Sequence, residues 1–100
     1  MLMASPDTSA EIEWQAKTLR GFAHPNRLKI LFMLRRHRQS VEPLARRLGV
    51  SETTILKHLA VLRARNIVAV RREGKSVLYE IARPEWDAFL TLLFAVSMRS

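Results

Sequence analysis

The sequence predicts a mainly α-helical domain with one small β-hairpin, made of about five helices and two antiparallel strands. Its 100 residues correspond in length to one ordinary domain. Apolar residues recur at helical spacing over most of the chain, whereas residues 68–81 alternate as strands do. The composition, 48% apolar and 26% charged, is that of a folded domain. We therefore expect a single domain over residues 8–98 after a disordered segment at 1–7.

The first two helices are expected to begin at Thr8 and at Pro25. Thr8 opens a capping-box pattern, and Gly21 is expected to weaken the end of the helix that follows. Proline suits the first position of the second helix, with His24 as the residue before it. This second helix should stop at the basic run 35–38.

The third and fourth helices are separated by a short turn. Ser40 can cap the short third helix, and Gly49 can take the left-handed conformation that ends it. Ser51 follows at once and can cap the next helix, which stops near Asn66. This spacing predicts a helix-turn-helix arrangement.

The fourth helix has two different faces. Ile55, Leu59 and Leu62 share one side, and the opposite side carries small, uncharged or cationic residues. Such a face is typical of a helix that enters a DNA groove, although a merely solvated face is the alternative. The candidate DNA-binding residues on this helix are Ser51, Thr53, Thr54, Leu56, Lys57 and His58.

Residues 68–81 read as a hairpin whose tip is cationic. The apolar residues of the two strands alternate, and basic residues crowd the turn around Gly74. The chain carries a net charge of +8, so a polyanion would relieve this repulsion; the alternative is an ordinary solvated hairpin. The candidate contacts to DNA phosphates, or to the edge of a minor groove, are Arg46, Arg47, Arg71, Arg72 and Lys75.

A last helix should begin at Pro84 and run to about Met98, with apolar residues around almost its whole circumference. One small core cannot cover all sides of such a helix, so a second copy of the chain is the expected partner. The alternative is a helix sunk into its own domain. The candidate dimer-interface residues are Ile12, Trp14, Leu19, Trp86, Phe89, Leu90, Leu93 and Phe94.

Several functional classes are disfavoured. The chain has no cysteine, so disulfides, thiolate metal sites and cysteine nucleophiles are excluded. None of His24, His37 and His58 has partners that suggest a metal site or catalysis, and we expect no enzyme activity, metal or cofactor. No apolar run reaches the length of a membrane span, and the N-terminus lacks the features of a secretory signal. A cytoplasmic location without membrane contact is therefore expected.

Four stretches of the sequence form a pattern that is specific when they are taken together. They are AHPNRLKIL at 23–31, LARRLGVS at 44–51, KHLAVL at 57–62, and RREGK at 71–75 followed by Val77 and Tyr79. Over about residues 15–96 the chain thereby resembles the arsenic-repressor (ArsR) family of winged helix-turn-helix transcription regulators. Leu56 departs from the pattern, since the family commonly has a DNA-facing serine there.

The resemblance implies a homodimeric DNA-binding regulator, usually a repressor that is released when an inducer binds or a residue is oxidised. A symmetric dimer predicts a double-stranded operator with two-fold symmetry. Metal-sensing members use cysteines on the third helix or Asp and His on the last, and this sequence has neither set. The alternatives are a winged-helix protein-interaction module and a metal- or ligand-responsive regulator with a non-cysteine site.

Overall fold

The computed structural model describes residues 8–99, so the expectation of disorder at 1–7 lies outside the described residues. The mainly helical fold with one hairpin is confirmed. The elements are α1 (Ser9–Phe22), α2 (Pro25–Leu34), α3 (Val41–Leu48), α4 (Glu52–Ala64), β1 (Val68–Glu73), β2 (Ser76–Ile81) and α5 (Pro84–Ser97).

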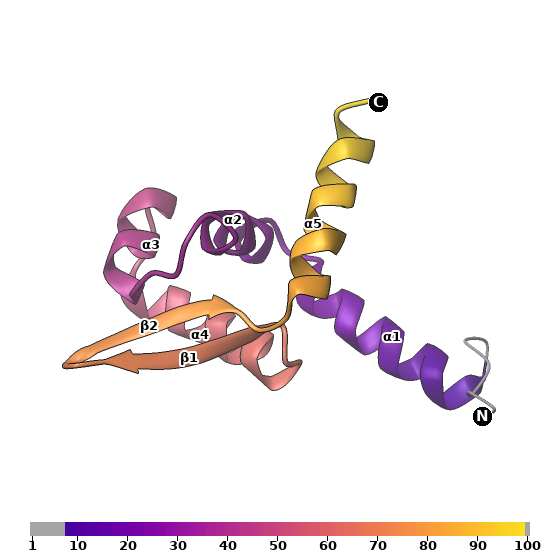
Figure 1. Cartoon of the computed structure of the whole chain (residues 1–100), viewed down its shortest axis with the longest axis horizontal. Helices are drawn as coiled ribbons and strands as arrows, with labels where there is room; N and C mark the ends of the chain where they lie inside the picture. The colour runs from indigo at the N-terminus through magenta and orange to yellow at the C-terminus, as the bar shows by residue number, and fades with distance from the viewer. Residues whose placement is uncertain (1–7, 100) are drawn as a thin grey trace.

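The molecule consists of a body and two projecting helices. Figure 1 shows α2, α3, α4 and the hairpin gathered in the body, while α1 and α5 extend away from it in different directions. The hairpin lies in front of α4 in this view, and β1 packs against that helix. The core is formed mainly by buried residues from α2, α3, α4 and the hairpin. Its largest fully buried side chains are Ile30, Leu31, Leu44, Ile55, Leu59, Leu62, Ile67, Val68 and Leu90.

The hairpin is held to the body by more than apolar packing. Its strands pair antiparallel, with Val68 opposite Ile81 and Val70 opposite Tyr79, and Gly74 at the turn has φ +61°. The loop between α2 and α3 also pairs with β2, because Gln39 and Tyr79 exchange both backbone hydrogen bonds, at 3.1 and 2.8 Å. The sequence did not predict this isolated bridge.

The turn between α3 and α4 has the predicted geometry. Gly49 is left-handed at φ +70°, and the Ser51 Oγ accepts the backbone N–H of Thr54 at 3.1 Å. Asn66, the second residue after the end of α4, also has a positive φ, +58°. Polar side chains with short reach tolerate this conformation best among non-glycine residues, which explains why the helix stops there.

Two capping predictions are wrong. Thr8 and Ser40 precede α1 and α3 with extended backbones, but neither side chain makes a capping hydrogen bond. Gly21 is also more than a weak helix end, since it is buried and α1 continues to Phe22. A Cβ at Gly21 would lie 3.2 Å from the Ile67 Cδ1 atom, so a larger residue there would require the Ile67 side chain to shift by a few tenths of an ångström.

The first half of α5 packs on its own protomer. Leu90, expected at the dimer surface, is fully buried, because α5 is apolar all round and the pattern does not show which side faces the core. Trp86 and Phe89 are partly buried, with ring centroids 5.3 and 5.0 Å from that of Phe22. The Arg35 Nε donates to Asp87 at 2.9 Å and ties α5 to the end of α2.

Candidate nucleic-acid interface

Helix α4 separates a core face from an exposed polar face. Ile55, Leu59 and Leu62 are buried as predicted, whereas Thr53 and Lys57 on the opposite side are exposed. The core residues fix the rotation of the helix about its own axis, so the polar face has one orientation relative to the body. Such a face can offer a hydroxyl and an ammonium group to base edges or phosphates.

Two hydroxyl groups at the start of α4 bond to one another. Ser51 Oγ donates to Thr54 Oγ1 at 3.0 Å while it accepts the Thr54 N–H. Ser51 is thereby occupied as the helix cap, whereas Thr54 keeps its hydroxyl proton for another acceptor. A contact through the Thr54 hydroxyl would be positioned in advance by the cap.

Apolar side chains complete the exposed side of α4. Leu56 is 47% exposed and Val61 is 37% exposed. At the position where the resemblance implies a serine, this chain has an isobutyl group that can contact a thymine methyl but cannot donate a hydrogen bond. Val61 was not among the predicted site residues, although helical periodicity already places it on this side.

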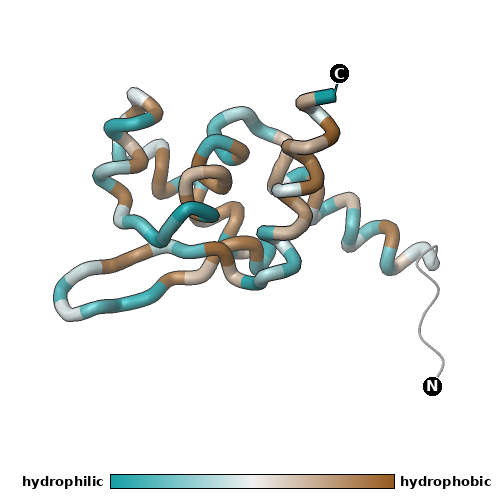
Figure 2. The backbone as a smooth tube through the Cα atoms, turned by 45° about the horizontal axis from the view of Figure 1, so that its top comes forward, coloured by the Kyte–Doolittle hydropathy of each residue, from teal (hydrophilic) through white to brown (hydrophobic). Residues whose placement is uncertain are grey.

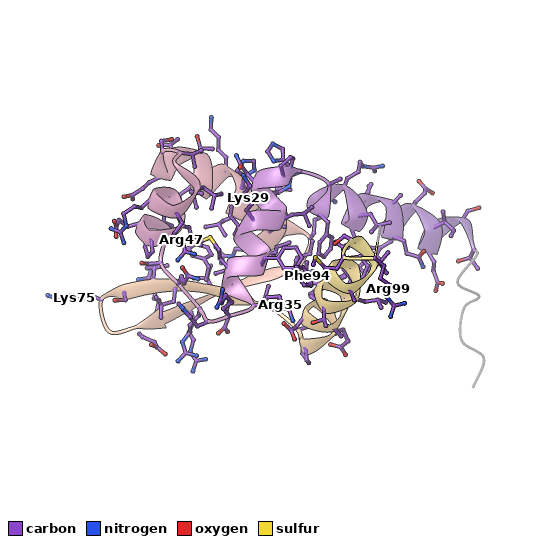
Figure 3. All side chains as sticks on the ribbon, turned by 90° about the horizontal axis from the view of Figure 1, so that it is seen from above. Lys29, Arg35, Arg47, Lys75, Phe94 and Arg99 are labelled. Carbon is purple, nitrogen blue, oxygen red and sulfur yellow. The ribbon has the colours of Figure 1, made fainter. Side chains whose placement is uncertain are left out.

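The hairpin β1–β2, which we call the wing, has a cationic tip. Figure 2 shows the hydrophilic colouring around its turn, and Figure 3 shows Lys75 extending beyond it. Arg71 pairs with Leu78 and Arg72 with Val77, so these adjacent arginines lie on opposite faces of the wing. The five candidate cations are therefore not equivalent.

Ion pairs distinguish the candidate phosphate contacts. Arg71 lies 3.4 Å from Glu73 and 3.6 Å from Glu80, and Arg46 lies 2.5 Å from Glu42 on the same helix. Within residues 8–99, no ion pair is found for the other three candidates, which are Arg47, Arg72 and Lys75. These three can meet an anion without first leaving a carboxylate.

An ion pair also connects the wing to the loop after α2. Arg38 Nη2 lies 3.0 Å from Glu73 Oε2, and both side chains are partly exposed. Exposed pairs of this kind contribute little to stability, roughly 0 to 1 kcal/mol. Together with the bridge between Gln39 and Tyr79, however, the contact restricts the direction in which the wing points.

His58 lies at the edge of α4, partly buried against the start of α2. Its ring centroid is 4.5 Å from that of His24, and its Nδ1 lies 3.4 Å from Arg27 Nη1. Burial first, and then the neighbouring charges of His24 and Arg27, lower the pKa of His58 below its ordinary value. The neutral imidazole is therefore favoured in this setting.

The other exposed large apolar residues lie on or next to the projecting helices. On α1 they are Ile12, Trp14 and Leu19, and on α5 they are Leu92, Leu93, Phe94 and Val96, with Met98 directly after its end. The Phe94 ring packs partly on Phe32 of α2, with centroids 6.1 Å apart, and Figure 3 shows it between the two helices. Leu92, 64% exposed, was missed by the sequence prediction because the apolar circumference of α5 hides its phase.

Neither a candidate metal site nor a candidate membrane span is found over residues 8–99. Across residues 8–99 there is no group of three or more His, Cys, Asp or Glu side chains placed to hold a metal ion. None of the helices in this range combines the length and apolar character required to span a bilayer.

A helix-turn-helix followed directly by a two-stranded wing defines the class of winged helix-turn-helix DNA-binding domains. The sequence model described as "Bacterial regulatory protein, arsR family" matches residues 24–70. That range runs from the cap of α2 through the recognition helix α4 into β1. The chain belongs to the arsR family and is a DNA-binding transcription regulator.

Relatives that match this chain over most of their own length support this assignment. The nodulation protein NolR of Rhizobium meliloti is 35% identical over 92% of this chain and 73% of its own length. The biofilm growth-associated repressor of Agrobacterium fabrum is 33% identical over 95% of this chain and 79% of its own length. Other relatives are described as transcriptional repressors and as a transcriptional activator.

A solved structure shows the same arrangement. The homodimeric winged helix-turn-helix DNA-binding domain Mb0332 of Mycobacterium bovis superposes with a TM-score of 0.84 at 29% identity. The match covers 97% of this chain and 90% of that one, so it includes the projecting helices as well as the body.

Proposed function

We propose that this chain is a homodimeric repressor that binds a two-fold symmetric operator. The observation that carries the proposal is the exposed face of α4, with Thr53 and Lys57, beside a wing whose tip bears cations without carboxylate partners. The face is polar without being bulky, so α4 can enter a major groove while the wing contacts the adjacent backbone. A repressor acts by occupying DNA, which requires no catalytic group.

The roles within the interface differ. Thr53, Thr54 and Lys57 contact base edges, while Leu56 lies at the margin and contributes apolar contact. Ser51 acts through the cap that positions Thr54. The phosphate contacts with the least internal competition are Arg47, Arg72 and Lys75, whereas Arg46 and Arg71 must exchange a carboxylate for a phosphate.

The dimer is formed by the exposed apolar residues of α1 and α5. In a two-fold symmetric dimer the two recognition helices lie roughly 34 Å apart, one turn of DNA. The homodimeric state of the superposing Mb0332 domain supports this arrangement. Regulation by a thiophilic metal is not part of the proposal, because the chain has no thiolate.

Selection of genomic fragments by the purified protein, followed by footprinting, tests the proposal. The expected result is an inverted repeat with half-sites one helical turn apart, and reduced transcription in vitro from a promoter that contains it. Increased transcription would make the chain an activator instead. Failure to shift random duplex DNA at low salt would favour a protein-interaction module, and a change of DNA affinity with zinc or nickel would indicate a metal-responsive regulator.

A further inference from the structure

A cluster of three nitrogen-rich side chains lies where α1, α2 and α4 meet. His24 precedes α2, Arg27 lies in its first turn, and His58 lies on the recognition helix. The two imidazole rings are tilted by 52° with centroids 4.5 Å apart, and the guanidinium group reaches His58 Nδ1 at 3.4 Å. The sequence stretches that contain these residues are far apart, so only the fold assembles the cluster.

The hydrogen bonds define where each imidazole carries its proton. His24 Nδ1 accepts the backbone N–H of Asn26 at 3.1 Å, and His58 Nδ1 accepts from Arg27, because a guanidinium group can only donate. Each neutral ring therefore has its proton on Nε2. A second proton on either ring would occupy Nδ1, remove a hydrogen bond and place a new positive charge in the cluster.

Arg27 is held rigidly by the end of α1. Its Nε donates to the carbonyl of Gly21 at 2.6 Å and its Nη2 to the carbonyl of Arg20 at 3.0 Å. These carbonyls lie at the negative end of the α1 dipole and compensate part of the guanidinium charge. One nitrogen, Nη1, remains directed at His58.

The charged groups around the cluster are cationic. Arg20 lies in the last turn of α1, Lys57 precedes His58 on α4, and Arg65, just after α4, approaches Gly21 with its side chain. The carboxylates of these two helices lie towards their starts, at Glu11, Glu13 and Glu52. Within residues 8–99, every ion pair found lies elsewhere, on the ends of α2 and α5, on α3 or in the wing. The cluster therefore lacks an anion.

We propose that His24, Arg27 and His58 bind a phosphate of the DNA backbone at the edge of the recognition helix, and that one proton is taken up with it. This inference rests on the proposed function. His58 follows Lys57 and lies one turn after Thr54, so a backbone beside that face is within reach of the partly exposed rings. A phosphate oxygen replaces His58 Nδ1 as the acceptor for Arg27, and solvent supplies the proton that makes Nδ1 of His58 a donor in addition to Nε2.

Proton uptake makes DNA affinity depend on pH in a defined direction. The affinity rises as the pH falls, by up to about tenfold for each pH unit over the range in which one proton is taken up. Because a phosphate contact carries no sequence information, the effect is expected on any duplex. The third histidine, His37, lies in the exposed basic run, with its Nδ1 3.2 Å from the neighbouring Arg38 carbonyl oxygen, and serves as the matched control.

The experiment measures the Kd for a random-sequence duplex by fluorescence anisotropy at fixed ionic strength, from about pH 5.5 to about pH 8. Wild type and His37→Gln should bind more tightly as the pH falls, whereas His58→Gln should show a much smaller dependence. His24→Gln provides a second variant should His58→Gln fail to fold, and circular dichroism reports folding at each pH.

The outcomes separate this inference from the proposed function. Equal pH dependence in wild type and in a folded His58→Gln or His24→Gln variant would overturn the inference, as would weaker binding by wild type at low pH. Binding that is tight but independent of pH contradicts the inference alone. Absence of duplex binding at any pH and low salt would contradict the proposed function.

Discussion

The two adjacent arginines of the wing have different partners because they lie on opposite faces of the strand. Side chains alternate between the faces of a strand, so Arg71 reaches Glu73 and Glu80 while Arg72 faces the other side, opposite Val77. The sequence predicted both as phosphate contacts, because composition and spacing show a basic tip without showing which carboxylates fold onto it.

Removal of each arginine should therefore affect DNA binding differently. Arg72→Gln should reduce the slope of log K against log salt by about 0.9, the value expected for one lost phosphate contact. Arg71→Gln should change the slope less, because its guanidinium group is already shared with two carboxylates. Salt titrations of both variants on one duplex measure this, and equal slopes would contradict the difference.

His58 also predicts how the stability of the free protein depends on pH. Its folded pKa lies below the ordinary value of 6.5, so the unfolded chain binds the proton more tightly. The contribution of the neutral ring is complete above about pH 6.5 and is lost as the pH falls towards the folded pKa. The Tm difference between wild type and His58→Gln should therefore shrink on acidification. A Tm difference that grows as the pH falls would contradict this prediction.

Among the helices and strands, the features found from sequence are those that depend on neighbours along the chain. Gly49, Ser51 and Asn66 each determine the backbone within a few residues, and their predicted roles are confirmed. The contacts that sequence did not predict, such as Arg35 with Asp87, join helices that are distant in sequence. Their partners depend on how the helices pack, which no local pattern encodes.

The turn between α3 and α4 can be tested directly. Gly49→Ala should lower the free energy of unfolding by about 1 to 2 kcal/mol, because a Cβ is strained at positive φ. Gly49→Asn should cost less, since asparagine tolerates this conformation. Apart from Gly49 and its chain neighbours, no atom of the described residues lies within 4 Å of the place that a Cβ would take, so a clash with other residues does not contribute. Urea unfolding of both variants checks this; an equal loss would contradict the backbone explanation.

For the assembly of the molecule, α5 has two roles along its length. Leu90 completes the core of one protomer, whereas Leu92 lies on the exposed apolar surface. The sequence predicted a dimerisation helix without this division, because apolar residues surround the helix and leave no polar side to orient it. Contacts with distant parts of the chain, such as those of Phe22 and Arg35 with α5, fix its rotation.

Substitutions at these two positions should separate assembly from folding. Leu92→Asp should yield folded monomers in sedimentation velocity and weaken binding to a two-fold operator, because a charge would be buried at the interface. Leu90→Ala should instead lower stability by about 2 to 5 kcal/mol through a cavity in the core. An intact Leu92→Asp dimer would remove α5 from the interface.

The pairing of Gln39 with Tyr79 and the contact of Arg38 with Glu73 attach the wing to the loop after α2. These contacts add to the chain connections at the ends of its two strands. A hairpin joined to the body only through its strand ends would swing, and would lose that freedom when it met DNA. Here much of the ordering entropy is already lost when the chain folds. The encounter with DNA then joins two preformed surfaces, at a rate governed by diffusion and long-range charge attraction rather than by rearrangement of the wing.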